Sequence, residues 1–486
     1  MRATVLPGAP TQADPADPLV LKLGRETSGF PVDVNHRGPP SGVFVCVGIY
    51  ERPSLNSMIH PHLENSLAEG PRAWKVSLLT ALLLVLVWSA CFFFPIVWTA
   101  TGIGEADKLF LDLRNILSAG ELAQQGLDPF LKNPLDPYNR LHGYTEWWFV
   151  TGAVGLTLAD TTWVGSLLLG MTLAATLLVL RPATWREGRS LFFVLVSPPL
   201  LLAINRANPD LPVFVLLGIA LVCFRGETAP RRALGVVLLA SAAVLKYFPL
   251  AAVVLLLDAR SRRELIGWVG LYLFVLVLAW PSLARGWQVA TSHQPAPSWL
   301  YAFGAPVLFR DFDLPVPLGW LAAAFMLVTA GLIKSMVRNE QTPPAEGAVR
   351  DWEREFAGGA VMVIGCFLHG SSYIYKLIFA LWMLPLFWRE TVTGTDARWR
   401  RATVVLLFAV LWIEGGMATI INLSVFAATL SIPAAEAWLK LTLAINQLLT
   451  FALVICLWRQ LLGYLLRKTL TQLAHFGLWN ERFPKF

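Results

Sequence analysis

Residues 233–258 read ALGVVLLASAAVLKYFPLAAVVLLLD, and this stretch decides the class of fold. Two apolar runs flank Lys246-Tyr-Phe-Pro249, and the first charged residue after that break is Asp258. A membrane-crossing helix needs roughly 20 apolar residues, so the stretch is too long for a single span. Proline ends or kinks the helix that precedes it. We therefore expect two short helices within a membrane, meeting at Lys246–Pro249.

The same apolar character extends over most of the chain. The residue types AVILMFWYC make up 56% of the 486 residues, which is more apolar surface than a soluble protein can bury. A second pair of short helices is expected over 357–388, joined at His369–Lys376. The sequence predicts an all-α polytopic membrane protein with about 11–13 transmembrane helices. The further candidate spans are 76–100, 161–180, 189–204, 211–225, 265–281, 316–334, 403–425 and 438–457.

Basic residues lie in short clusters between the apolar runs and indicate the orientation of the chain. With the expected spans, every cluster falls on one side, which the positive-inside rule assigns to the cytoplasm. The net charge of +7 therefore reflects topology and does not indicate a nucleic-acid partner. Segment 144–158 would invert every later loop if it crossed the membrane. Because it contains Trp147 and Trp148, we expect an interfacial or partly inserted helix there.

The two ends of the chain differ from the apolar middle. Residues 1–72 are rich in Pro, Gly and Asp and lack helical periodicity, so we expect a disordered cytoplasmic extension. Translation from Met58 is an alternative explanation of this stretch. The transmembrane domain is expected over 73–460, followed by a cytoplasmic tail at 461–486. The five cysteines have no metal-binding spacing, and no glycine-rich nucleotide loop is present, so we expect neither a metal nor a cofactor.

Polar groups interrupt the apolar sequence mainly on the side opposite the basic clusters. That side receives the loops 101–160 and 282–315 and the tight turns between short helices. Ionisable residues at membrane depth are costly and usually face a cavity or a partner. Several of them on one side predict a polar site there. The candidate site residues are Asp112, Arg206, Asn208, Asp210, Lys246, His369 and Lys376.

Most of these residues also have an ordinary structural explanation. Asp112 begins an amphipathic helix (DLRNILSAGELAQQGLDPF, 112–130), where the helix dipole favours an acid. Asn208 and Asp210 suit a turn followed by a helix N-terminus. Lys246 suits a snorkelling lysine. Arg206 lies on the side where basic residues are disfavoured, so it indicates a specific anionic partner.

A carboxylate near several cations at a membrane surface suits group transfer from a lipid-linked phosphate. The cations bind the leaving phosphate, and the carboxylate takes a proton from the attacking hydroxyl. A histidine beside an apolar run is more often a packed core residue. His369 is included because Arg206 and Lys246 are expected to emerge on the same face.

The order of these features resembles the GT-C glycosyltransferases, specifically the polyprenol-phosphate-sugar enzymes of glycosyltransferase family 87. The resemblance covers roughly residues 76–460. The Asp112-led helix is similar to the first-loop helix of that family, and NRANPD (205–210) is similar to its Arg-x-Asn-x-Asp turn. LKYFP (245–249) looks like the Lys-aromatic-Pro break of the family. LHGSSYIYKLIFALWMLP (368–385) is similar to a late motif in which Arg is usual where Lys376 stands.

The resemblance implies a GT-C-like bundle with extracytoplasmic loop helices in a bacterial inner membrane. It implies inverting, metal-independent transfer of a mannose-like hexose from a polyprenyl-phosphate donor to an extracytoplasmic glycan or lipid acceptor. Asp112 would be the general base, with Asp107 as an alternative. A transporter or lipid-linked glycan flippase stays open as another function, although no internal repeat is evident, and so does an inactive homologue. The implied substrate-binding residues are Arg206, Asn208, Asp210, Lys246, Lys376 and, as a weaker candidate, His369.

Overall fold

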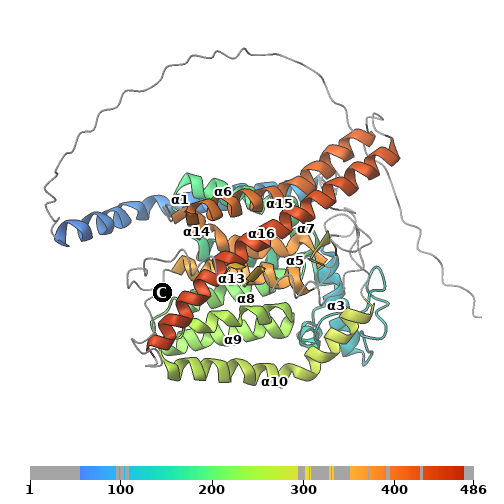
Figure 1. Ribbon diagram of the computed structural model, residues 1–486. Coiled ribbons are helices and arrows are strands. Elements are labelled where there is room, and N and C mark those ends of the chain that lie inside the picture. The colour runs from blue at the N-terminus through green and yellow to red at the C-terminus, as the bar shows by residue number, and fades with distance from the viewer. Residues whose placement is uncertain are drawn as a thin grey trace, which may run out of the picture.

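The computed structural model describes residues 55–94, 98, 103, 109–293, 302–305, 307, 328–329, 331–332, 351–369, 372–389, 395–426 and 431–475. Nearly every element in these ranges is a helix (Figure 1). Two short strands, β1 (Ala302–Phe303) and β2 (Ser372–Tyr373), pair antiparallel with each other. The predicted all-α class is confirmed.

Among the described residues, five helices are long and apolar enough to cross a membrane. A sixth crossing is possible where α6 (Trp185–Leu195) and α7 (Pro198–Arg206) form a pair bent by 60°. The chain is therefore a multi-pass membrane protein, as predicted, although the described residues hold five or six such helices and not the expected 11–13. The expected span 316–334 lies almost entirely outside the described residues. The five long helices are α1 (Leu55–Phe93), α5 (Thr161–Leu180), α10 (Arg262–His293), α15 (Thr395–Phe426) and α16 (Ile432–His475).

Both expected helix breaks are present. α9 (Ala229–Leu245) ends directly before Lys246, whose backbone is extended, and the 3₁₀ helix η3 (Phe248–Asp258) follows. α13 (Asp351–His369) is likewise followed by β2 and the 3₁₀ helix η4 (Ile374–Met383), which continues into α14 (Leu384–Arg389). A 3₁₀ helix rises about 2.0 Å per residue against about 1.5 Å for an α-helix. These short segments therefore reach further through the bundle than α-helices of the same length.

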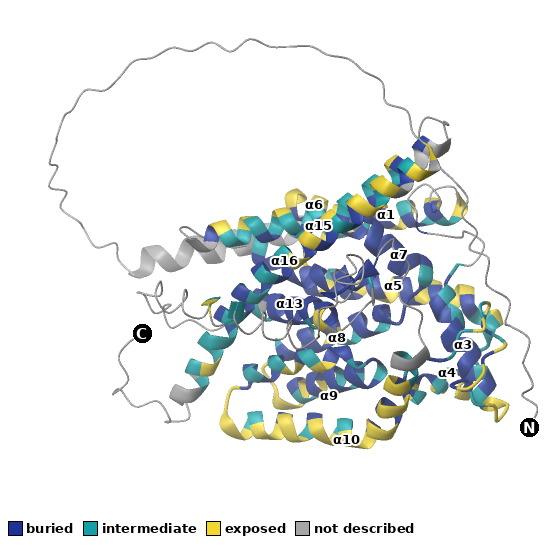
Figure 2. Cartoon of the chain, turned by 45° about the vertical axis from the view of Figure 1, so that its right-hand side comes forward, coloured by how far each residue is buried: buried dark blue, intermediate teal, exposed yellow. Residues whose placement is uncertain are grey.

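The core of the bundle surrounds α8 (Asp210–Phe224), η4 and α13. Figure 2 shows α8 and α13 largely buried, and every residue of η4 is buried. Phe214 stacks on Trp382 with ring centroids 4.0 Å apart. Gly218 makes room for the same indole, because a Cβ there would lie 3.0 Å from the ring. By contrast, α10 lies at the periphery and exposes apolar side chains such as Val277 (70%) and Leu278 (63%). Lipid is the solvent that such a surface requires.

The bundle has two chemically different ends. At one end, Arg225 donates to the Val179 carbonyl and pairs with Glu355, while Arg260 donates to the carbonyls of the 226–227 turn. The turns after α5, α8 and η3, which carry Arg181, Arg225 and Arg260, therefore lie together, as the charge pattern predicts. The opposite end gathers the C-termini of α7 and α9 and the N-termini of α8, η3 and η4.

Residues 109–160, the continuously described stretch before α5, pack on this opposite end as short helices. These are α3 (Leu111–Gln124), η1 (Glu146–Phe149), α4 (Val150–Ala153) and η2 (Leu158–Asp160), and none of them is long enough to cross a membrane. Segment 144–158 therefore makes no crossing, as predicted. Trp148 Nε1 donates to the Leu245 carbonyl at 3.0 Å, which ties η1 to the end of α9. Trp147, Val150 and Val154 leave an apolar stripe exposed.

α1 begins at Leu55, well before the predicted span start at 76, and residues 1–54 lie outside the described part. Four cysteines are buried and unbonded, as their positions in apolar runs predict; they are Cys91, Cys223, Cys366 and Cys456. Cys46 lies outside the described residues.

Candidate active site

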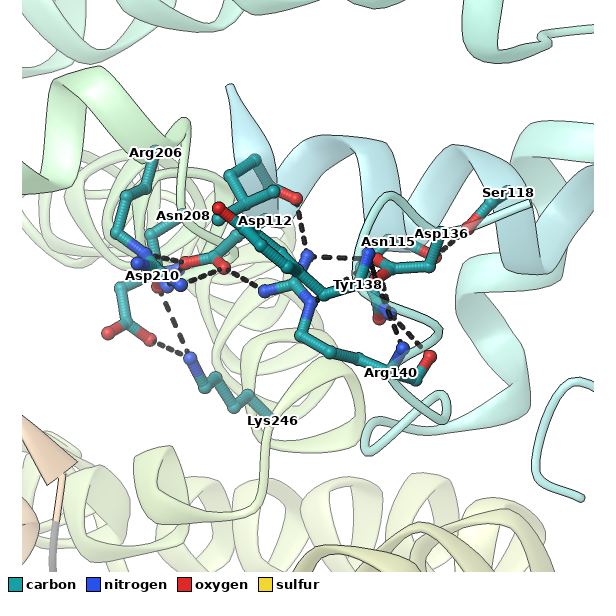
Figure 3. Close-up of polar contacts among 11 residues, drawn as sticks. Asp112, Asn115, Ser118, Asp136, Tyr138, Arg140, Arg206, Asn208, Asp210 and Lys246 are labelled. Atoms are coloured by element: carbon teal, nitrogen blue, oxygen red, sulfur yellow. Dashed lines mark hydrogen bonds and ion pairs between the residues drawn. The ribbon is translucent and has the colours of Figure 1, made fainter. Parts of the chain in front are cut away.

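Asp112 lies at the centre of a network of charged side chains (Figure 3). It is the second residue of α3, and its side chain is only 5% exposed. Arg206 donates from Nε to Oδ2 at 2.8 Å and from Nη2 to Oδ1 at 2.7 Å, which is a bidentate pair. Asn208 Nδ2 donates to Oδ2 at 2.6 Å, and Arg140 Nη1 donates to Oδ1 at 3.0 Å. The carboxylate is thus fully hydrogen-bonded by three side chains.

The backbone around Phe110 brings Asp112 to α7. Phe110 adopts a left-handed conformation with φ 60°, and its N–H donates to the Asn205 carbonyl at 2.7 Å. Its ring lies over Gly165, where an added Cβ would be 2.4 Å from the ring carbon Cδ2. α3 therefore begins where α7 ends, and its first turn faces Arg206.

The NRANPD turn positions Arg206, Asn208 and Asp210 from one short stretch. Arg206 is the last residue of α7, and Ala207 turns the chain with φ 41°. The Asn208 amide then has two roles. Its Oδ1 accepts from the Asp210 N–H at 2.9 Å, which forms an Asx turn directly before α8, while its Nδ2 donates to Asp112. The turn expected at Asn208 is therefore present, and the same amide also contacts Asp112.

Asp210 is the counter-ion of the two lysines at the helix breaks. Its side chain is fully buried, and its Oδ1 lies 2.5 Å from Lys246 Nζ. Its Oδ2 lies 3.5 Å from Lys376 Nζ. Both lysines are only 6% exposed, and both lie over the Phe248 ring, Lys376 at 3.9 Å and Lys246 at 5.5 Å. Lys246 is thus ion-paired within the site, so it is not a snorkelling lysine.

Arg140 and Asp136 also belong to the network, although neither is among the predicted site residues. Asp136 forms a turn, since its Oδ1 accepts from the Tyr138 N–H at 2.9 Å. Its buried carboxylate also pairs with Arg140, through Nη2 to Oδ2 at 2.9 Å and Nε to Oδ1 at 3.1 Å. Arg140, like Arg206, is a basic residue on the side where the positive-inside rule disfavours it. That signal would have found it.

The neighbouring cations determine the protonation of Asp112. Burial alone would raise the pKa of this carboxyl. The Arg206 guanidinium, together with Arg140 and Asn208, lowers the pKa by more than burial raises it. The result is a pKa well below the ordinary value for aspartate, so Asp112 is ionised at neutral pH. The pKa of Asp136 is also lowered, because its bonds to Arg140 outweigh its burial.

The site carries one positive charge in excess. Four cations, Arg140, Arg206, Lys246 and Lys376, face three carboxylates, Asp112, Asp136 and Asp210. Such a cluster suits an anionic ligand that exchanges for one of the internal carboxylates. Within the described ranges, no group of three or more His, Cys, Asp or Glu side chains is arranged to hold a metal ion.

Two candidate residues stay predictions. His369 ends α13, but its side chain lies outside the described part of the structure, as does all of Asp107. Asp112, Arg206, Asn208, Asp210, Lys246 and Lys376 are brought together as one contiguous network. A scan against protein-family models finds no match for this sequence, and a search of curated proteins finds none either. The geometry of the network therefore carries the functional argument.

Proposed function

We propose that this protein is a membrane glycosyltransferase that uses a polyprenyl-phosphate sugar as donor, with Asp112 as the general base. The observation that carries the proposal is a buried carboxylate that shares one network with four cations. This network lies at one end of a bundle of apolar helices. A lipid-linked phosphate sugar has its anionic group at the membrane surface, where such a cluster of cations would meet it.

The proposed reaction is the transfer of a hexose, mannose-like by the family resemblance, to a hydroxyl of a glycan or glycolipid acceptor. The acceptor oxygen forms a bond to C1 of the donor sugar on the face opposite the phosphate. The bond between C1 and the phosphate oxygen breaks, and its electron pair leaves with polyprenyl phosphate. Asp112 takes the proton of the acceptor hydroxyl. Lys246 and Lys376 stabilise the charge that develops on the leaving phosphate.

The two ends of the bundle support an orientation for this chemistry. The basic loops around Arg225 and Arg260 lie at the end opposite Asp112. The positive-inside rule assigns that end to the cytoplasm. The site would then face the exterior of a bacterial inner membrane.

The experiment is a transfer assay on purified protein with polyprenyl-phosphate mannose or glucose and glycan acceptors. We expect wild-type protein to transfer the sugar and Asp112→Asn to lose at least about 100-fold in kcat, since general bases contribute about 10²–10⁴. Glu121→Gln, on the same helix, serves as the matched control and should stay near wild type. Among the described residues, its carboxylate accepts the Leu158 N–H and makes no contact with the network.

Two results would contradict the proposal. Unchanged turnover by Asp112→Asn would exclude Asp112 as the base. Movement of a labelled solute or lipid across proteoliposomes, without any sugar transfer, would favour a transporter or flippase.

A further inference from the structure

Two arginines hold the same carboxylate in different ways. Arg206 places both prongs of its guanidinium on Asp112. Arg140 gives Asp112 a single hydrogen bond and directs its remaining contacts elsewhere. The difference predicts which arginine leaves Asp112 when an anionic ligand arrives.

Arg140 is anchored independently of Asp112. Its Nη2 donates to the Leu111 carbonyl at 2.7 Å and to Asp136 Oδ2 at 2.9 Å. Asp136 is itself held, because Asn115 Nδ2 donates to it at 3.1 Å and its side chain is fully buried. Arg140 would therefore keep its position after Asp112 is protonated or loses another partner.

Arg206 has no second carboxylate among the described residues. Apart from Asp112, its guanidinium lies over the Tyr373 ring at 5.1 Å, and its side chain is 19% exposed. A phosphate offers the same bidentate geometry as a carboxylate and carries more charge. An entering phosphate therefore competes with Asp112 for this arginine.

We infer that the two arginines divide the work: Arg140 is a positioning residue that keeps Asp112 in place, and Arg206 moves from Asp112 to the donor phosphate. This inference rests on the proposed function and specifies the role of each arginine within it. Donor binding then removes the strongest cation from the base. Its pKa rises, so Asp112 becomes a better proton acceptor only when the donor is bound. The site is held inactive until a phosphate enters.

The first test measures binding and needs no turnover. Detergent-solubilised protein is titrated with polyprenyl phosphate that carries no sugar, and the dissociation constant is obtained from the shift in thermal unfolding. We expect Arg206→Gln to weaken binding about 10- to 100-fold, the range for a lost charged hydrogen-bonding group. Arg140→Gln should stay within about threefold of wild type. Equal weakening by both variants, or no binding by wild type, would overturn the inference.

The second test follows the pH dependence of transfer. The kcat/KM profile reports the free enzyme, and kcat reports the enzyme with substrate bound. Both Arg→Gln variants should move the acidic limb of kcat/KM to higher pH, since each removes a cation beside Asp112. Only Arg140→Gln should move the acidic limb of kcat, because Arg206 has already left Asp112 in the bound state. If the acidic limb of kcat moves as far in Arg206→Gln as in Arg140→Gln, the two arginines do not have the different roles inferred for them.

The anchor itself is tested by a double-mutant cycle. Asp136→Asn should lower kcat by about 10-fold or more through misplacement of Arg140. The double variant Asp136→Asn/Arg140→Gln should be no worse than Arg140→Gln alone, because both changes act on one interaction. Asp136→Asn combined with Arg206→Gln should instead be additive. Wild-type protein could fail to transfer sugar and still bind polyprenyl phosphate, with weaker binding only in Arg206→Gln. That result would reject the glycosyltransferase proposal and leave the assignment of the phosphate ligand to Arg206 standing.

Discussion

Replacement of Asp210 by Asn tests whether this residue is the counter-ion that allows two lysines to be buried. The substitution keeps the size of the side chain and removes its charge. Lys246 and Lys376 then remain 6% exposed, without the carboxylate that lies 2.5 Å and 3.5 Å from their ammonium groups. Removing one partner of a buried ion pair costs about 3–5 kcal/mol. We expect a loss of stability in that range for Asp210→Asn.

The measurement is equilibrium unfolding of the purified protein in mixed detergent micelles. Glu227→Gln removes one negative charge at an exposed position and is the matched control, expected within about 0.5 kcal/mol of wild type. Lys376→Met added to Asp210→Asn should recover part of the loss, since one unpaired cation is removed. Inorganic phosphate should also stabilise Asp210→Asn, by about 2.7 kcal/mol at 100 times its dissociation constant for the variant, and should stabilise wild type less at the same concentration.

Two results would contradict the counter-ion role of Asp210. If Asp210→Asn unfolds within about 0.5 kcal/mol of wild type, like the control, the lysines do not depend on this carboxylate. If the variant is destabilised but Lys376→Met adds a further loss, the lysines contribute mainly through packing, and Asp210 is not acting as a counter-ion.

Two further predictions concern the loop that covers the site. His142 is fully buried, its ring lies 3.1 Å from the Thr145 carbonyl, and burial lowers its pKa to about 4. The unfolded chain therefore binds more protons between about pH 6.5 and 4, so stability falls as pH falls through this window, by about 3 kcal/mol. The free energy of unfolding of His142→Gln should fall less between pH 7 and pH 4.5 than that of wild type. An equal fall in both proteins would show that His142 is not the source of the pH dependence. Gly120→Ala would place a Cβ 2.7 Å from the Gly152 nitrogen and should destabilise the protein by about 1–3 kcal/mol. Gly170→Ala is the control and should not destabilise it, because nothing lies within 4 Å of the added Cβ. Equal stabilities of the two variants would show that α3 and α4 are not in close contact.

The apolar pattern predicted the helices well where lipid or core surrounds them. α5 runs from Thr161 to Leu180, as expected, because its apolar run is bounded by polar residues at both ends. α1 and α10 extend beyond their expected spans, since a hydropathy pattern reports where lipid lies and not where a helix ends. The breaks at Lys246 and Lys376 were predictable, because a charged residue interrupts a long apolar run at each of them.

The site was predictable only in part. Arg206, Asn208 and Asp210 lie in one short turn, so their proximity follows from sequence. Their contact with Asp112 depends on how the polar loop after α1 folds back, and apolar periodicity carries no information about that. The pairing of Asp136 with Arg140 was hidden for the same reason, since an Asp-Pro pair predicts a turn whether or not it also holds a cation.

Three cations of the site lie where the backbone leaves regular helix. A helix break and a buried cation are each unfavourable in lipid, which explains why they occur together. Arg206 ends α7, Lys246 follows α9, and Lys376 lies at the start of η4. A broken helix leaves backbone N–H and carbonyl groups unpaired, which lipid does not tolerate, so breaks occur where protein or water surrounds them. A buried cation has the same requirement. With the helix breaks and the cations at the same end of the bundle, one polar environment serves both, and Asp112 and Asp210 supply the negative charge. An anionic substrate that displaces a carboxylate from such a network keeps every cation paired, so it can enter without leaving a buried cation uncompensated.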